Sequence, residues 1–170
     1  QGDRLEEMYD NIPGQWDGIW LMPGSKDHLL DFCHIKNAII GIQVDTLANT
    51  AKPTLTLSNS RIENMTAVGL YAQGSTILAY NNLISNCGQF AVRLVIGGAY
   101  EFYHCTIANY WGYSTRTTPS LLLNNYYIDV YSQIQLRPVE KALFGNCIIY
   151  GNKESEIIID KADGAGLSYK

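Results

Sequence analysis

The chain has 170 residues, which is the length of a single domain. Apolar residues make up 46% of it and charged residues only 16%, so the composition is that of a packed protein and excludes a disordered one. The net charge of −4 argues against a nucleic-acid-binding face. No apolar run approaches the roughly 18 residues of a membrane-spanning helix.

A short phrase recurs along the chain. It reads apolar, any residue, Asn or His, small, any residue, Ile, any residue, Asn. Its copies occupy residues 57–64, 79–86, 102–109 and 144–151, with a degenerate first copy at 31–37. Helical repeats need about 33 residues or more, and this period is shorter, at about 22 to 27. Such a period accommodates three short strands and three bends, which together predict one turn of a β-solenoid.

A second strand signal lies between these copies. It consists of six four-residue segments, which we call rows. Each row begins with a small or polar residue and is apolar at its second and fourth positions, where side chains should point inward. The six rows are 18–21, 41–44, 69–72, 91–94, 120–123 and 156–159. The alignment predicts two buried stacks, one of Ile35, Ile62, Ile84, Ile107 and Ile149, the other of Ile42, Leu70, Val92 and Leu121.

One polar column of the phrase holds Asn59, Asn81, His104 and Asn146. It falls where the chain must bend between strands, and Asn tolerates the left-handed backbone conformation of such a corner. Because the column repeats on successive turns, we expect its amides to hydrogen-bond one another from coil to coil.

The cysteines give no sign of a metal site. Cys33, Cys105 and Cys147 share the small position after the Asn column, and Cys87 lies elsewhere. Cys105 and Cys147 are the only pair expected on adjacent coils. Stacked side chains point the same way, so we predict no disulfide. The chain has no CxxC pair and no Cys/His cluster that would suggest zinc.

Two segments interrupt the repeat between Ile107 and Ile149. Residues 110–119 read as a long bend, and residues 125–138 read as a protruding loop or an extra hairpin. Long insertions in solenoids gather on one face and are often where binding occurs.

The outward columns of the rows supply the candidate binding site. The third position of each row forms one outward column, which contains Trp20, Gln43, Tyr71, Arg93, Leu122 and Ile158. The residue directly after each row forms the other, the fifth column, which contains Met22, Asp45, Gln73, Val95, Asn124 and Asp160. Six of these side chains suit sugars, since aromatic faces stack on sugar rings and amides or a guanidinium bind hydroxyls or carboxylates. They are Trp20, Gln43, Asp45, Tyr71, Gln73 and Arg93. The plain alternative is an ordinary solvent-facing sheet.

Catalysis has weaker support. A glycosidase needs two carboxylates about 5 to 9.5 Å apart. On this face Asp45 and Asp160 are four rows apart, which corresponds to roughly 19 Å at about 4.8 Å per row. The sequence therefore assigns no catalytic residue, no metal ligand and no cofactor.

The chain resembles the right-handed parallel β-helix proteins of the pectate-lyase-like superfamily, and more narrowly the surface or lipoprotein-type β-helix proteins of Bacteroidetes. Residues 2–5, the stretch 13–19 and the Asn-Cys-Ile phrase at 146–148 carry this resemblance. It implies an all-β fold, a single-stranded right-handed parallel β-helix (a β-solenoid) of about six coils. The pectate lyases gather acidic residues around calcium with an arginine nearby, and only Arg93 sits in a comparable environment here.

We therefore expect residues 1–170 to form one β-helix domain, a fragment of a longer solenoid. The leading interpretation is a secreted or surface-displayed, extracytoplasmic module that is structural or binds a polysaccharide. The alternative is a polysaccharide lyase, hydrolase or epimerase whose catalytic coils lie partly outside this chain. A third interpretation is an adhesin segment in which coils of neighbouring chains stack end to end.

Overall fold

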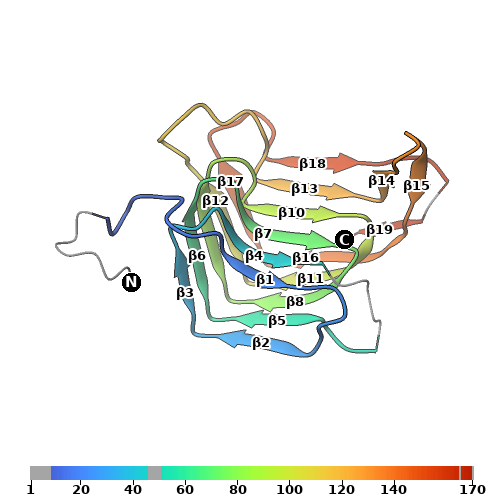
Figure 1. Cartoon of the computed structure of the whole chain (residues 1–170), viewed down its shortest axis with the longest axis horizontal. Coiled ribbons are helices and arrows are strands. Elements are labelled where there is room, and N and C mark those ends of the chain that lie inside the picture. The colour runs from blue at the N-terminus through green and yellow to red at the C-terminus, as the bar shows by residue number, and fades with distance from the viewer. Residues whose placement is uncertain (1–8, 46–50, 165, 170) are drawn as a thin grey trace.

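The computed structural model describes residues 9–45, 51–164 and 166–169, without the side chains of 167–169. The described residues form strands and turns but no helix. Three parallel sheets run along the molecule, and the chain visits them in the same order on every coil (Figure 1). This arrangement is a parallel β-helix, which confirms the predicted all-β solenoid.

Each sheet collects one strand from each coil. Sheet one contains β1 (Ile19–Leu21), β4 (Ile40–Val44), β7 (Val68–Gln73), β10 (Val92–Val95), β13 (Leu121–Asn124) and β18 (Ile157–Asp160). Sheet two contains β2 (His28–Asp31), β5 (Leu55–Ser58), β8 (Thr76–Tyr80), β11 (Gly98–Tyr103), β16 (Val139–Gly145) and β19 (Leu167–Tyr169). Sheet three contains β3 (His34–Lys36), β6 (Arg61–Met65), β9 (Leu83–Cys87), β12 (Thr106–Asn109) and β17 (Ile148–Gly151).

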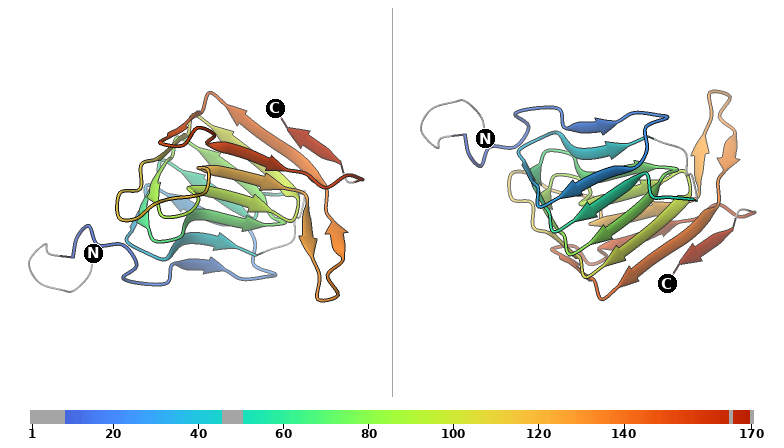
Figure 2. Two further views of the ribbon diagram at one scale, coloured as in Figure 1. Left: turned by 90° about the horizontal axis from the view of Figure 1, so that it is seen from above. Right: turned by 90° about the horizontal axis from the view of Figure 1, so that it is seen from below.

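The two interruptions of the repeat lie at different corners. Between β12 and β13 the chain crosses from sheet three to sheet one through a loop that covers residues 110–120. Between sheets one and two of the same coil, β14 (Tyr126–Ile128) and β15 (Ile134–Leu136) pair as an antiparallel hairpin. Figure 2 shows this hairpin projecting away from the stacked coils.

The predicted apolar stacks form the core. Ile62, Ile84 and Ile107 are fully buried and in register on sheet three, and the row from Ile42 to Leu121 is buried on sheet one. Ile149 is only half-buried, which corrects the prediction for it. The reason is that β17 is the edge strand of sheet three, so Ile149 has a neighbouring strand, β12, on one side only. Ile157 and Ile159 are exposed for the same reason, since β18 ends sheet one.

The polar column lies at the corner between sheets two and three, as predicted. Its four members have φ angles of 48°, 57°, 53° and 53°, at Asn59, Asn81, His104 and Asn146. The Asn81 side chain donates to Oδ1 of Asn59 at 2.7 Å, and Asn59 donates to Oδ1 of Asp31 at 2.8 Å. The left-handed corner is therefore confirmed for all four members, and the coil-to-coil hydrogen bond between amides is confirmed for Asn59 and Asn81.

All four cysteines are free thiols. Burial raises the pKa of Cys87 to about 12 and also raises the pKa of Cys105, so both remain protonated at neutral pH. A search of the described residues for a helix long and apolar enough to cross a membrane finds none.

Candidate functional site

The outward third column of the rows forms one continuous line across sheet one. Trp20 pairs with Gln43, Gln43 with Tyr71, and Tyr71 with Arg93. The line continues from Arg93 through Leu122 to Ile158. Parallel pairing sets neighbouring strands about 4.8 Å apart, so the first four rows span roughly 14 Å. The six candidate side chains therefore share one surface, which we call the sheet-one face.

Asp45 organises the first three rows of this face. Its Oδ2 accepts hydrogen bonds from Trp20 Nε1 at 2.6 Å and from Gln43 Nε2 at 2.8 Å. Its Oδ1 accepts from Gln73 Nε2 at 2.5 Å. Three donors from three coils thus converge on one carboxylate. The network fixes the orientation of the indole ring, which is 57% exposed.

Arg93 occupies the next row and is held by aromatic rings. Its guanidinium carbon lies 5.0 Å from the centroid of Tyr71 and 5.5 Å from that of Phe90. These distances are within the range of cation–π attraction. Nε of Arg93 is buried without a hydrogen-bond partner, and no acceptor among the described residues pairs with the rest of the guanidinium. The face therefore contains one positively charged donor with no acceptor.

Tyr71 contributes an uncharged phenol beside this cation. Burial raises the pKa of Tyr71, the positive charge of Arg93 acts in the opposite direction, and Asp45 raises it further. The net result is a phenol that stays protonated at neutral pH and can donate a hydrogen bond.

A shallow pocket adjoins Trp20 at the edge of the face. It has a volume of about 220 Å³ and is lined by the indole together with Asp17, Gly18, Ile19, Ile39, Ile40 and Gln43. The lining is mainly aliphatic and aromatic. It extends the exposed ring of Trp20 into a hollow that can receive the apolar side of a flat molecule.

The structure adds one residue to the predicted set and revises another. Phe90, which the row alignment omitted, packs against Arg93 from the turn that precedes the row. The sequence signal that could have identified this contact is the position of Phe90, three residues before Arg93. Val95 was expected to be exposed in the fifth column but is 5% exposed. It lies beside Gln73, and on the other side Oδ1 of Asn124 accepts a hydrogen bond from the backbone N–H of Ile96 at 2.9 Å.

The far end of the face meets the hairpin. Tyr126 Oη on β14 donates to Oδ2 of Asp160 at 2.7 Å, and this hydrogen bond is the main reason that the pKa of Tyr126 is raised. Asp45 and Asp160, the two outward carboxylates, are thus both engaged by neighbouring donors.

In the described part of the chain, no three His, Cys, Asp or Glu side chains gather as metal ligands would.

Comparison with known proteins identifies the fold family. The family model described as a right-handed β-helix region matches residues 40–168, which is more than half of the chain. Searches of curated proteins and of solved structures found no match. The narrower resemblance to Bacteroidetes surface proteins stays a prediction. With three parallel sheets, six rows and this match over most of its length, the chain belongs to the right-handed parallel β-helix family.

Proposed function

We propose that this domain is a carbohydrate-binding module that holds a polysaccharide along the sheet-one face. The observation that carries the proposal is the guanidinium of Arg93. It is fixed between Tyr71 and Phe90 and has no acceptor among the described residues. Because Nε is buried, an external acceptor would bind the terminal Nη groups of this guanidinium, which has five N–H donors in all. Sugar hydroxyl or carboxylate oxygens supply such acceptors.

The remaining groups of the face support an extended ligand. Trp20 and Tyr71 present ring faces two rows apart, and hydrogen bonds to Asp45 hold Trp20, Gln43 and Gln73 in place. A surface that is ordered before binding loses less conformational entropy when the ligand arrives. The roughly 14 Å of these four rows, at about 4.8 Å per row, suits two or three sugar units.

The proposal includes display outside the cytoplasm, as the resemblance to surface-type β-helix proteins implies. A polysaccharide ligand fits that location. Cleavage of the native protein by protease added to intact cells would support the placement, and full protection until the cells are lysed would contradict it.

Screening against acidic and neutral polysaccharides tests the proposal. Affinity electrophoresis measures binding, and chromatography of the same mixtures detects released products. We expect retardation by at least one polysaccharide without product release. Released oligosaccharides would favour the lyase, hydrolase or epimerase alternative. Failure to bind any polysaccharide would refute the proposal.

A pair of tryptophan variants localises the binding. Trp20→Ala removes an exposed ring and one Nε1 hydrogen bond from the face. Trp16→Ala is the matched control, because Trp16 is 41% exposed and donates one Nε1 hydrogen bond to Lys36 O outside β1. We expect weaker binding in Trp20→Ala alone. Equal loss in both variants would indicate a general effect of losing an indole.

A further inference from the structure

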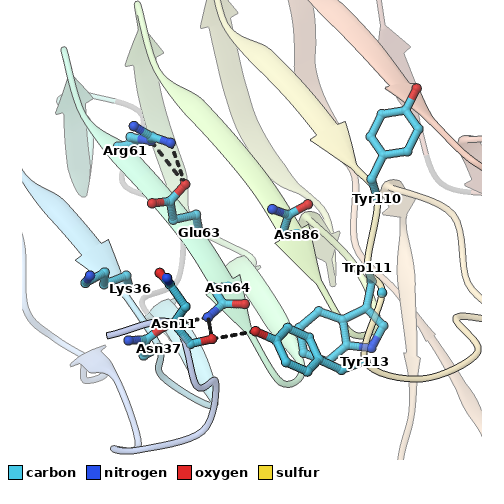
Figure 3. A pocket seen from close by; sticks show the side chains of 11 residues that line it. Asn11, Lys36, Asn37, Arg61, Glu63, Asn64, Asn86, Tyr110, Trp111 and Tyr113 are labelled. Atoms are coloured by element: carbon cyan, nitrogen blue, oxygen red, sulfur yellow. Dashed lines mark hydrogen bonds and ion pairs between the residues drawn. The ribbon is translucent and has the colours of Figure 1, made fainter. Parts of the chain in front are cut away.

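A second pocket lies on the opposite side of the coils, between sheet three and the 110–120 loop. Its volume is about 350 Å³, within the range of about 300–1,000 Å³ typical of small-molecule sites. Figure 3 shows three walls. The N-terminal segment at Asn11 forms one, strand β6 with the neighbouring asparagines Asn37 and Asn86 forms the floor, and Tyr110, Trp111 and Tyr113 form the third. We call it the corner pocket.

Hydrogen bonds between distant parts of the chain hold the walls together. Tyr113 Oη donates to the backbone oxygen of Asn11, although 102 residues separate them. Asn64 donates to the same oxygen at 2.8 Å and to Oδ1 of Asn37 at 2.6 Å. Asn37 in turn donates to Asp10 O at 2.8 Å. The pocket is therefore closed at this end, so it accommodates a short ligand or a chain end.

The aromatic wall is ordered by its own contacts. Trp111 is 7% exposed, donates to Ser114 Oγ at 2.9 Å, and packs against Tyr113 with ring centroids 4.9 Å apart. Tyr110 stands at the other end of this wall, 48% exposed and 5.6 Å from the ring of Tyr150. Tyr110 and Tyr113, the exposed rings of this wall, offer apolar faces next to a polar floor, and the buried ring of Trp111 supports Tyr113.

The charged residues that line the pocket are two cations and one carboxylate. Glu63 Oε2 accepts from Arg61 Nη2 at 2.8 Å, and Glu63 Oε1 lies 2.8 Å from His34 Nε2. Lys36 adds a second cation and has no ion-pair partner among the described residues. The lining therefore has one more positive than negative charge, and Glu63 is already paired with Arg61.

One asparagine offers both a donor and an acceptor without a competing partner. The Asn86 side chain lines the pocket, is exposed, and makes no hydrogen bond within the described part of the chain. Its φ of 50° places it at the corner with Asn37 and Asn64, whose φ angles are 63° and 64°. An amide both donates and accepts, as a hydroxyl does.

We propose that the corner pocket binds a sugar unit, either a free mono- or disaccharide or the end of a glycan chain. Mixed donors and acceptors match hydroxyl groups, and the exposed rings of Tyr110 and Tyr113 match the C–H face of a sugar ring. This site shares no residue with the sheet-one face and does not depend on the function proposed for that face.

Chemical-shift titration of the ¹⁵N-labelled protein tests the site. The probes are methyl glycosides of glucose, galactose and mannose, N-acetylglucosamine, and inorganic phosphate. We expect at least one neutral sugar to shift the signals of Asn86 and residues 110–113, whether or not the signals of Trp20 and Tyr71 also shift. Shifts confined to the sheet-one face, or no shift with any sugar, would overturn the proposal.

A matched pair of asparagine variants supplies the control. Asn86→Gly removes the free amide and keeps a residue that accepts positive φ. Asn146→Gly does the same at the opposite corner, where Asn146 is exposed with a φ of 53°. We expect about fivefold or greater loss of sugar affinity in the first variant only, as for a lost hydrogen bond to a neutral group. Equal affinity in the two variants would contradict the site.

Glu63→Gln separates a sugar site from an anion site. If the pocket binds a neutral sugar through the carboxylate, this variant binds the sugar more weakly and gains no affinity for phosphate. Phosphate that binds the wild-type chain, and binds more tightly after the charge of Glu63 is removed, would show that the pocket is an anion site and would overturn the proposal.

Discussion

Arg116 and Glu156 form an ion pair at 2.7 Å, with the arginine side chain fully buried and the glutamate side chain 10% exposed. Arg116 lies in the 110–120 loop, and Glu156 precedes β18 in the last row. Arg116 also donates to Asn109 O at 3.0 Å and to Asn152 Oδ1 at 2.8 Å. This contact fixes the long loop, and with it the aromatic wall of the corner pocket, to the final coil.

Replacing Arg116 by methionine should destabilise the protein by about 3–5 kcal/mol. Removing one partner of a buried pair leaves the other charge buried without compensation. The free energy of unfolding from urea titration measures the effect. Arg61→Met is the control, because Arg61 pairs with Glu63 on the surface with its side chain 55% exposed. Exposed pairs contribute about 0–1 kcal/mol, and an equal loss in both variants would contradict the account.

The same pair makes stability depend on pH. Burial opposes ionisation of Glu156, but hydrogen bonds from Arg116, Ser120 and Lys153 together outweigh it and lower its pKa from the ordinary value of 4.5. A lowered pKa in the folded state gives stability that is fully present above the unfolded pKa and is lost as pH falls through the folded pKa.

Urea midpoints of the wild type and Glu156→Gln should therefore converge on acidification. We expect the wild type to be more stable at pH 7, and the difference to shrink as the pH falls below about 4.5, the ordinary value for this carboxyl. A difference that stays constant from pH 7 to pH 3 would show that the ionised carboxylate of Glu156 contributes no stability.

The rows were predictable because each obeys one local rule. A small residue at the corner and apolar residues at alternate positions set which side chains face outward, so the line from Trp20 to Ile158 follows from alignment of the rows. The asparagine corners were predictable for a similar reason, because positive φ favours Asn, which occupies this corner in three coils while His104 occupies it in a fourth.

Contacts outside the repeat were not predictable in this way. Arg116 and Glu156 are 40 residues apart, and Asn11 and Tyr113 are 102 apart, with no period connecting either pair. Both contacts depend on the path of the 110–120 loop, which has no repeat to set its conformation. The corner pocket was missed for this reason, although the loop was expected to be a place where binding occurs.

Truncating the core isoleucine stack should be costly in the middle coils. Ile84→Ala removes a fully buried side chain and should cost about 2–5 kcal/mol, the usual range for a core cavity. Ile148→Ala is the control, since that side chain is 63% exposed on the outer surface of β17. Chemical denaturation of both variants gives the comparison. Similar losses would contradict the assignment of the inward column.

Gly69 should not tolerate alanine. An added Cβ would lie 2.5 Å from the Ala91 backbone oxygen and 2.7 Å from Cγ2 of Ile84, so backbone or core must move. We expect a loss of about 1–3 kcal/mol, as for other overpacked cores. Gly112→Ala is the control, because no atom lies within 4 Å of its added Cβ. Equal thermal midpoints for the two variants would show that the corner has room.

Affinity of the double variant Tyr71→Ala/Arg93→Ala for the polysaccharide that the wild type binds best tests the central claim most directly. The control is Tyr103→Ala/Lys141→Ala, which removes an aromatic ring and a cation beside Glu101 on sheet two. We predict that the first variant loses detectable binding with its circular dichroism spectrum unchanged, while the control binds as the wild type does. Unchanged affinity in Tyr71→Ala/Arg93→Ala would contradict the assignment of polysaccharide binding to the sheet-one face.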